Sequence, residues 1–194
     1  MTNFSLRILL FIAGFSLSAS THAASVAFDV NTQDVTLGSE FSLVVMGSDF
    51  PAISGGGLTL LFDPAVLQIT SVTINTSVFE FYIGDGPEKG VLNNSLGSLT
   101  NTAFNSIVGA TGNFSIMTIK FTAIGSGTTM LSLSESSIWV FSDTRGNAIG
   151  DQLVFGETHI NVSPVPVSAA FWLLSGGLLI LASLFRLNAQ SDSV

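Results

Sequence analysis

Residues 25–163 consist of short segments in which apolar and polar side chains alternate, separated by clusters of Gly, Asn, Asp and Ser. Ile119, Phe121 and Ala123 follow the period of two that places alternate side chains on one face of a strand. No apolar repeat with helical spacing precedes Val167. About nine short strands without intervening helices predict an all-β fold, an antiparallel β-sandwich of two packed sheets, with a closed barrel as the alternative.

The alternation also predicts where the strands lie and which side chains they bury. We expect strands over 26–30, 40–47, 58–62, 67–74, 79–83, 114–123, 128–133, 137–142 and 158–162. The segment 91–112 is rich in Asn, Ser and Thr, and we expect at most short strands within it. The side chains predicted to lie between the two sheets are Phe41, Leu43, Leu60, Phe62, Leu67, Ile119, Phe121 and Leu131.

The first residues have the organisation of a secretory signal peptide. Arg7 supplies a positive charge, 8–17 is an apolar run too short to span a bilayer, and 21–24 ends in small residues that a signal peptidase accepts. We therefore expect residues 1–24 to be removed on export, with retention as a membrane anchor as the alternative. Residues 25–163 then form one exported domain of ordinary size.

The end of the chain, residues 164–194, has the features of a membrane anchor. No charged residue occurs from 167 to 185, and as a helix this run spans roughly 28 Å, close to the hydrocarbon thickness of a bilayer. Pro164 and Pro166 precede the run and Arg186 follows it. The sequence predicts a transmembrane helix over 167–185. The alternative is a buried core helix, but a core helix is normally amphipathic and this run is apolar all round.

Few residues are charged, and cysteine is absent. Lys and Arg number 5 against 13 Asp and Glu, and the formal net charge is −8. A chain this acidic cannot form the basic patch that offsets nucleic-acid phosphates, so we expect no nucleic-acid partner. Without cysteine the exported domain has no disulfides and no thiolate metal sites, and it must be stabilised by its core alone.

Four segments of the domain carry a resemblance to a known family: 35–41 (VTLGSEF), 58–67 (LTLLFDPAVL), 112–123 (GNFSIMTIKFTA) and 127–133 (GTTMLSL). Taken in order, they resemble the cohesin domain family. The second resembles the family's alternating strand followed by aromatic-Asp-Pro, and the third its late strand ending in Ile-x-Phe-x-Ala. The resemblance covers about residues 26–162. It implies a nine-stranded jelly-roll sandwich, related in shape to cellulose-binding modules, and the binding of dockerin modules, although no dockerin-facing motif can be matched.

The tail begins with a short motif formed by Val165, Pro166, Val167, Ser168 and Ala169. This motif and the apolar run after it resemble PEP-CTERM sorting signals in their Val-Pro-Leu-Pro-Ala variant. Ser168 takes the place of the second proline, and Arg186 stands where the family has a basic cluster. The membrane anchor would comprise Phe171, Trp172, Leu173, Leu174, Leu178, Leu179 and Arg186. The resemblance implies recognition by an exosortase-like sorting peptidase and a protein of a Gram-negative envelope or exopolysaccharide matrix, either anchored or released.

The sequence predicts no catalytic, cofactor-binding or metal-binding residues. His159 is the single histidine of the expected domain. The sequence offers too few further ligands for a zinc site and no evident nucleophile and carboxylate for a Ser-His-Asp site. We expect His159 to be partly buried in a strand. Calcium is the most realistic ion, at one of two acidic segments that lack EF-hand spacing and are more simply read as solvated turns. Those segments contain Asp85 and Glu88, and Asp143, Asn147 and Asp151. The other carboxylates, such as Asp49 and Asp63, are also spread over turns.

The aromatic residues favour core packing over sugar stacking, since there are 16 Phe against 2 Trp and 1 Tyr. Phe79, Phe81 and Tyr82 place rings on both faces of one expected strand. The residues and the resemblance together favour a non-enzymatic binding module at the cell surface, contacting a dockerin-type protein or a polysaccharide. The alternative is an enzyme or accessory protein of polysaccharide turnover, which two convergent carboxylates in a cleft would distinguish.

Overall fold

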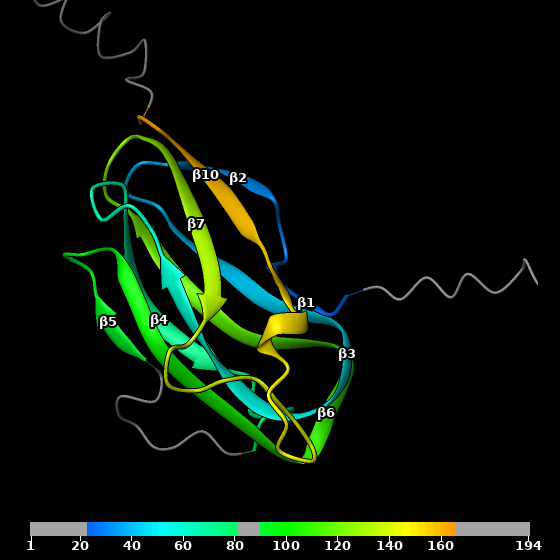
Figure 1. Ribbon diagram of the computed structural model, residues 1–194. Helices are drawn as coiled ribbons and strands as arrows, with labels where there is room; N and C mark the ends of the chain where they lie inside the picture. The colour runs from blue at the N-terminus through cyan, green and yellow to red at the C-terminus, as the bar shows by residue number, and fades with distance from the viewer. Residues whose placement is uncertain (1–22, 81–89, 166–194) are drawn as a thin grey trace, which may run out of the picture.

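The computed structural model describes residues 23–80 and 90–165, which form ten β-strands and one short 3₁₀ turn, Gly150–Gln152 (Figure 1). The strands are β1 (Ser25–Phe28), β2 (Thr32–Thr36), β3 (Glu40–Leu61), β4 (Leu67–Ile74), β5 (Val91–Asn93), β6 (Ser98–Ala123), β7 (Gly127–Glu135), β8 (Ser142–Asp143), β9 (Val154–Phe155) and β10 (Glu157–Ser163). The predicted all-β class is confirmed. Across the described residues no helix has the length and apolarity needed to cross a bilayer.

The strands fold into two layers because the long strands β3 and β6 bend and contribute to both. The front sheet has the order β5, β6, β3, β7, β10, β2, and the back sheet has the order β4, β6, β3, β1, β9. Figure 1 shows β2, β10 and β7 side by side in the front sheet. β3 joins the strands predicted at 40–47 and 58–62. It changes layer between Gly47 and Gly55, where its pairing with β6 repeatedly shifts register.

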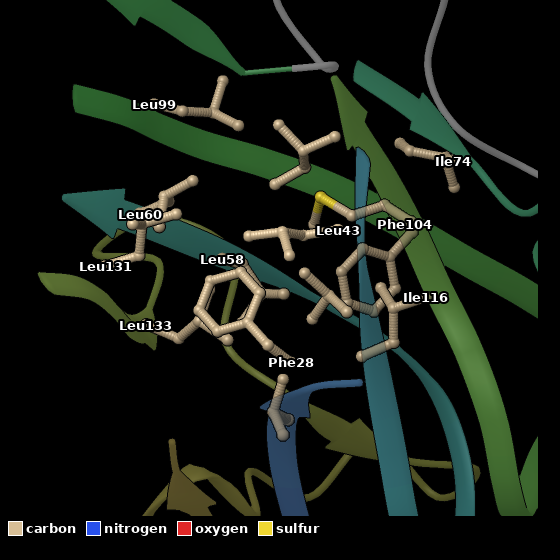
Figure 2. Close-up of a cluster of buried hydrophobic side chains, with 14 of the residues drawn as sticks. Phe28, Leu43, Leu58, Leu60, Ile74, Leu99, Phe104, Ile116, Leu131 and Leu133 are labelled. Atoms are coloured by element: carbon tan, nitrogen blue, oxygen red, sulfur yellow. The ribbon is translucent and has the colours of Figure 1, made fainter. Parts of the chain in front are cut away.

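Side chains from both layers fill the space between the sheets (Figure 2). Leu58 and Leu60 of the front sheet meet Leu43 of the back sheet there. Seven of the eight predicted core residues are buried. The exception is Phe41, which is half-buried and stacks on Phe121 with ring centroids 5.4 Å apart. Its place at the margin of the core therefore still stabilises the sandwich.

Two of the strand pairs are parallel, so the prediction of a wholly antiparallel sandwich is wrong at these positions. β10 pairs in parallel with β2, and β1 pairs in parallel with β9. A ladder of side chains crosses the first pair. The Thr128 hydroxyl on β7 donates to Asn161 Oδ1 (3.0 Å), and Asn161 Nδ2 donates to Asp34 Oδ1 on β2 (2.8 Å). The period of two identifies strands, but it does not specify which strands become neighbours.

The polar segment 91–112 contains more strand than predicted, namely β5 and the first part of β6. Hydroxyl side chains occupy core positions here, because Thr102 and Ser106 are buried on either side of Phe104. Thr102 Oγ1 donates to the Leu58 carbonyl (3.0 Å) and accepts from the Leu58 N–H (2.9 Å). Buried hydroxyls with such partners can take the place of apolar side chains. The polar composition of this segment was therefore a poor guide to its structure.

Two further predicted strands differ from the structure. Residues 137–141 form a loop before the two-residue β8, and Phe79 follows a turn in which Asn75 Oδ1 accepts from the Ser77 N–H (3.1 Å). The Phe79 ring is fully buried against Phe104, with 4.7 Å between centroids, which confirms the core interpretation of this ring. Phe81 and Tyr82 lie outside the described residues, as do the expected signal peptide up to residue 22 and the helix predicted at 167–185.

Candidate binding face and groove

The outer face of the front sheet is uncharged over β5, β6, β3 and β7. Leu58 and Leu60 point into the core, so Thr59 and Leu61 point outward. The register places Leu61 opposite Ser98 on β6 and opposite a serine on β7. The outward residues, which we call the uncharged face, are Thr59, Leu61, Val91, Asn93, Ser98, Thr100, Met130, Ser132 and Ser134.

Three apolar side chains on the uncharged face are open to solvent. The exposed fractions are 50% for Leu61, 48% for Met130 and 53% for Val91. Hydroxyl and amide groups surround them. A charged residue, Glu157 of β10, lies at the margin of the face, opposite Ser132. Apolar centres, uncharged polar neighbours and peripheral charges are the composition of a protein–protein interface.

A groove of about 360 Å³ lies on the same sheet, and its lining on β3 ends at Gly56, three residues before Thr59. β3 and β6 are paired here, with Gly55 opposite Asn105 and Gly56 opposite Phe104. None of the lining residues is charged. They are Ser54, Gly55 and Gly56 of β3, Ala103, Phe104 and Asn105 of β6, and Ile138, Trp139, Val140 and Ser142 between β7 and the start of β8.

Residues 136–141, which we call the covering loop, lie directly on the glycines of β3. A Cβ on Gly57 would lie 2.6 Å from the Cβ of Trp139, and a Cβ on Gly56 would lie 2.6 Å from the ring of Phe141. Glycine alone allows so close an approach. Phe141 is thereby buried in the core, while Trp139 stays 40% exposed at the groove. The run of three glycines is the sequence signal that could have located this site.

Buried polar contacts hold the covering loop in place. Ser136 is only 3% exposed, and its hydroxyl accepts from the N–H groups of Ile138 and Trp139, both at 3.2 Å. The same hydroxyl lies 3.0 Å from Asn101 Oδ1, to which it donates. Asn101 has a positive φ of 57° where β6 bulges away from β3. Ser136 therefore positions Trp139 through the backbone of the loop.

His159 is exposed on β10, because Thr158 and Ile160 take the inward positions of that strand. The expectation of a partly buried histidine is therefore wrong. Its neighbours in register are Met130 on β7 and Thr32 on β2. In the described ranges, no group of three or more His, Asp or Glu side chains is arranged to hold a metal ion.

Asp143 and Asn147, from one of the two candidate calcium segments, come together in a turn. Asp143 Oδ1 accepts from the N–H groups of Arg145 and Asn147, both at 2.8 Å, and Oδ2 accepts from Asn147 Nδ2 at 2.8 Å. These bonds, led by the one from the Asn147 side chain, lower the pKa of Asp143 below its ordinary value. The carboxylate is thus engaged within its own turn. The other segment, with Asp85 and Glu88, lies outside the described residues, and calcium binding stays a prediction.

Of the predicted sorting motif, Val165 is the member that the structure describes, and it is exposed beyond the end of β10. Pro166, Val167, Ser168 and Ala169 lie outside the described residues, as do all the anchor residues from 171 to 186. The sorting signal and the membrane anchor therefore stay predictions.

No family model and no curated protein matches the chain, whereas solved structures do. The sixth cohesin of scaffoldin B from Acetivibrio cellulolyticus, solved with a Cel5 dockerin mutant, matches with a TM-score of 0.56 at 16% identity, covering 73% of this chain and 100% of the other. A type II cohesin from the cellulosome of the same organism has a TM-score of 0.53 at 16% identity, covering 72% and 96%. A non-cellulosomal cohesin from Archaeoglobus fulgidus has a TM-score of 0.53 at 15% identity, covering 77% and 96%.

The described residues therefore have the cohesin fold, a jelly-roll sandwich. Structural similarity at identities this low establishes the fold alone, so the function has to be argued from the site. The resemblance seen in the sequence is confirmed at the level of the fold. The segment 58–67 forms the end of β3 and a turn in which Asp63 Oδ1 accepts from the Ala65 N–H (2.8 Å), and 112–123 forms the end of β6.

Proposed function

We propose that this chain is a non-enzymatic protein-binding module that docks a partner through the uncharged face. The observation that carries the proposal is the cohesin fold, because the scaffoldin B cohesin with this fold was solved in complex with a dockerin. By this analogy of fold, the partner is a dockerin-type protein. The composition of the uncharged face supports the proposal independently.

The uncharged face offers a partner both apolar surface and hydrogen-bonding groups. Leu61 and Met130 are large exposed side chains that a partner could remove from water, at about 25 cal/mol per Å². The hydroxyls of Ser98 and Ser132 flank Leu61 on both neighbouring strands. A flat sheet makes many modest contacts, so we expect micromolar affinity for a single partner and gain from many copies at a surface.

We further propose that the domain works at the bacterial envelope, outside the cytoplasm. This part rests on the sequence. The predicted signal peptide 1–24 would export the domain, and the uncharged run 167–185 would hold it at the membrane. The motif that begins at Val165 would present it to an exosortase-like peptidase, which would keep it anchored or release it to the matrix.

Calorimetry of the purified full chain against a panel of dockerin modules tests the docking proposal. Leu61→Asp places a charge at the centre of the uncharged face. We expect it to weaken binding at least about tenfold, because the partner would bury an unpaired carboxylate. The melting temperature should fall only slightly, since half of the Leu61 side chain is already exposed to solvent. Gln68→Asp, at an exposed position of β4 on the back sheet, is the matched control.

Equal binding by the wild type and Leu61→Asp would overturn the proposal, as would the absence of binding to every dockerin module in the panel. A reducing-sugar assay on envelope polysaccharides is run alongside. Sugar release that disappears when a single Asp or Glu is changed would establish the alternative function, an enzyme of polysaccharide turnover.

A further inference from the structure

We propose that the groove beside the covering loop binds a neutral sugar ring, at a site separate from the protein-docking face. Its volume of about 360 Å³ falls within the range of small-ligand sites, about 300–1,000 Å³. It is lined mostly by apolar groups with a few polar side chains, which is the usual composition of such sites. Two features of the lining point to a carbohydrate: an exposed indole and uncharged polar side chains.

The exposed indole belongs to Trp139. The Phe rings near the groove, Phe79, Phe104 and Phe141, are all buried, so the core is complete without this side chain. The contacts of Ser136 with the loop backbone hold Trp139 at the groove rather than in the core. An indole combines a large apolar face, which can stack on the C–H face of a sugar ring, with an N–H that can donate to a hydroxyl. The expectation that aromatic residues here serve packing holds for the phenylalanines that the structure describes, whereas Trp139 is 40% exposed.

The polar groups of the groove favour a neutral, hydroxylated ligand. Asn105 is exposed at the groove, and the hydroxyls of Ser54 and Ser142 lie 2.9 Å apart along its lining. An ionised ligand would find no counter-charge among the lining residues, and an anionic one would also meet a chain of net charge −8. The two hydroxyls already hydrogen-bond to each other, and Ser54 also bonds to backbone carbonyls, so Asn105 is the group that an aliphatic side chain of a protein partner would leave without a partner. A sugar can bond to Asn105 while it stacks on Trp139.

The full chain can report on the groove by fluorescence. It contains two tryptophans, so Trp172→Phe leaves Trp139 as the single reporter. The protein is purified in a zwitterionic detergent, because glycoside detergents would compete for the site. It is titrated with cellotriose, maltotriose and the galacturonic acid trimer. We expect a saturable change in Trp139 emission, and heat in calorimetry, with at least one neutral trisaccharide and none with the anionic trimer.

Two substitutions at exposed positions test the geometry without disturbing the core. Trp139→Ala should weaken neutral-sugar binding at least about tenfold in calorimetry, because the stacking surface is lost. Asn105→Ala should weaken it severalfold. Ile124→Ala, an exposed apolar position in the turn after β6, is the matched control and should bind like the wild type.

The proposal is overturned if no neutral trisaccharide gives a saturable response, or if Trp139→Ala binds as well as the wild type. It is also overturned if Trp139→Ala abolishes dockerin binding while no sugar binds, since the groove would then belong to the protein partner. The docking proposal is tested separately by Leu61→Asp, so either one can fail while the other stands.

Discussion

The Phe121 side chain packs against aromatic rings from both layers of the sandwich. It is fully buried, and it stacks on Phe41 of the back sheet. Its ring also lies edge to face with that of Phe62, which directly follows the front-sheet end of β3, with 6.2 Å between centroids. Phe121→Ala should lower the free energy of unfolding by about 3–5 kcal/mol, because it removes buried surface and leaves a cavity. Urea unfolding of the full chain followed by circular dichroism measures this.

The control for this substitution is Ile124→Ala, three residues further on and exposed. It should change the free energy of unfolding by less than about 0.5 kcal/mol, as substitutions on the surface usually do. An unfolding midpoint of Phe121→Ala equal to that of the wild type would show that the ring does not join the two sheets.

The stability of the turn after β8 should depend on pH through the Asp143 carboxylate. The ionised carboxylate accepts the hydrogen bonds of its turn, so the folded pKa lies below the unfolded one and the unfolded state binds more protons. The stabilisation is therefore complete above the ordinary pKa of an aspartate and is lost as the pH falls through the lower, folded value. Asp143→Asn should be less stable than the wild type at neutral pH, and this difference should vanish in acid.

Melting temperatures measured across this pH range test the prediction. Asp151→Asn, an exposed isosteric change on the 3₁₀ turn that follows, is the control. A stability difference between the wild type and Asp143→Asn that stays constant into acid would refute the assigned role of the carboxylate.

At the scale of the element, the position of the covering loop depends on glycines of β3, which have no side chain to keep the loop away. Gly57→Val would drive a branched side chain into the Cβ of Trp139 and the carbonyl oxygen of Thr102. We expect a loss of about 1–3 kcal/mol in stability from this overpacking. We also expect a red shift of Trp139 emission in the Trp172→Phe background, because the displaced loop exposes the indole to water.

Ala52→Val is the matched control, since it adds a branched side chain at an exposed position of the same strand. It should leave both the stability and the emission close to those of the wild type. If Gly57→Val behaves like this control, the covering loop does not lie against β3 as described.

At the scale of the whole molecule, the placement of the domain across the membrane can be tested because the chain has no cysteine. Single cysteines are introduced by Thr73→Cys, at an exposed position of β4, and by Ser193→Cys, beyond Arg186. In spheroplasts of a host without a sorting peptidase, a membrane-impermeant maleimide should label Thr73→Cys. It should label Ser193→Cys only after permeabilisation, because the positive end of the predicted helix would stay inside. The reverse pattern would contradict an exported domain.

The period of two in the sequence determined the class of the fold and most of its core. Leu43, Leu60 and Leu67 are buried as predicted, because each lies in a segment whose alternation leaves one face apolar. The strand predicted at 67–74 has the bounds of β4, since the preceding Asp63-Pro64 turn ends one strand before the next begins. These features are local, so a single sequence is enough to reveal them. The resemblance of four segments to the cohesin family further predicted which β-sandwich fold the chain adopts.

Only the tertiary structure decided which strands are neighbours, and the candidate site follows from that choice. The parallel pairs of β10 with β2 and of β1 with β9, and the passage of β3 and β6 between layers, depend on contacts between residues far apart in the sequence. The uncharged face exists because β5 and β7 flank β6 and β3. The groove exists because Gly57 lets Trp139 lie directly on β3, although the two residues are about eighty positions apart in the sequence. No motif or periodicity in the sequence indicates that they are neighbours in space. The alternation of apolar and polar residues shows which face of a strand is buried. Which strands pair with each other depends on packing over the whole chain.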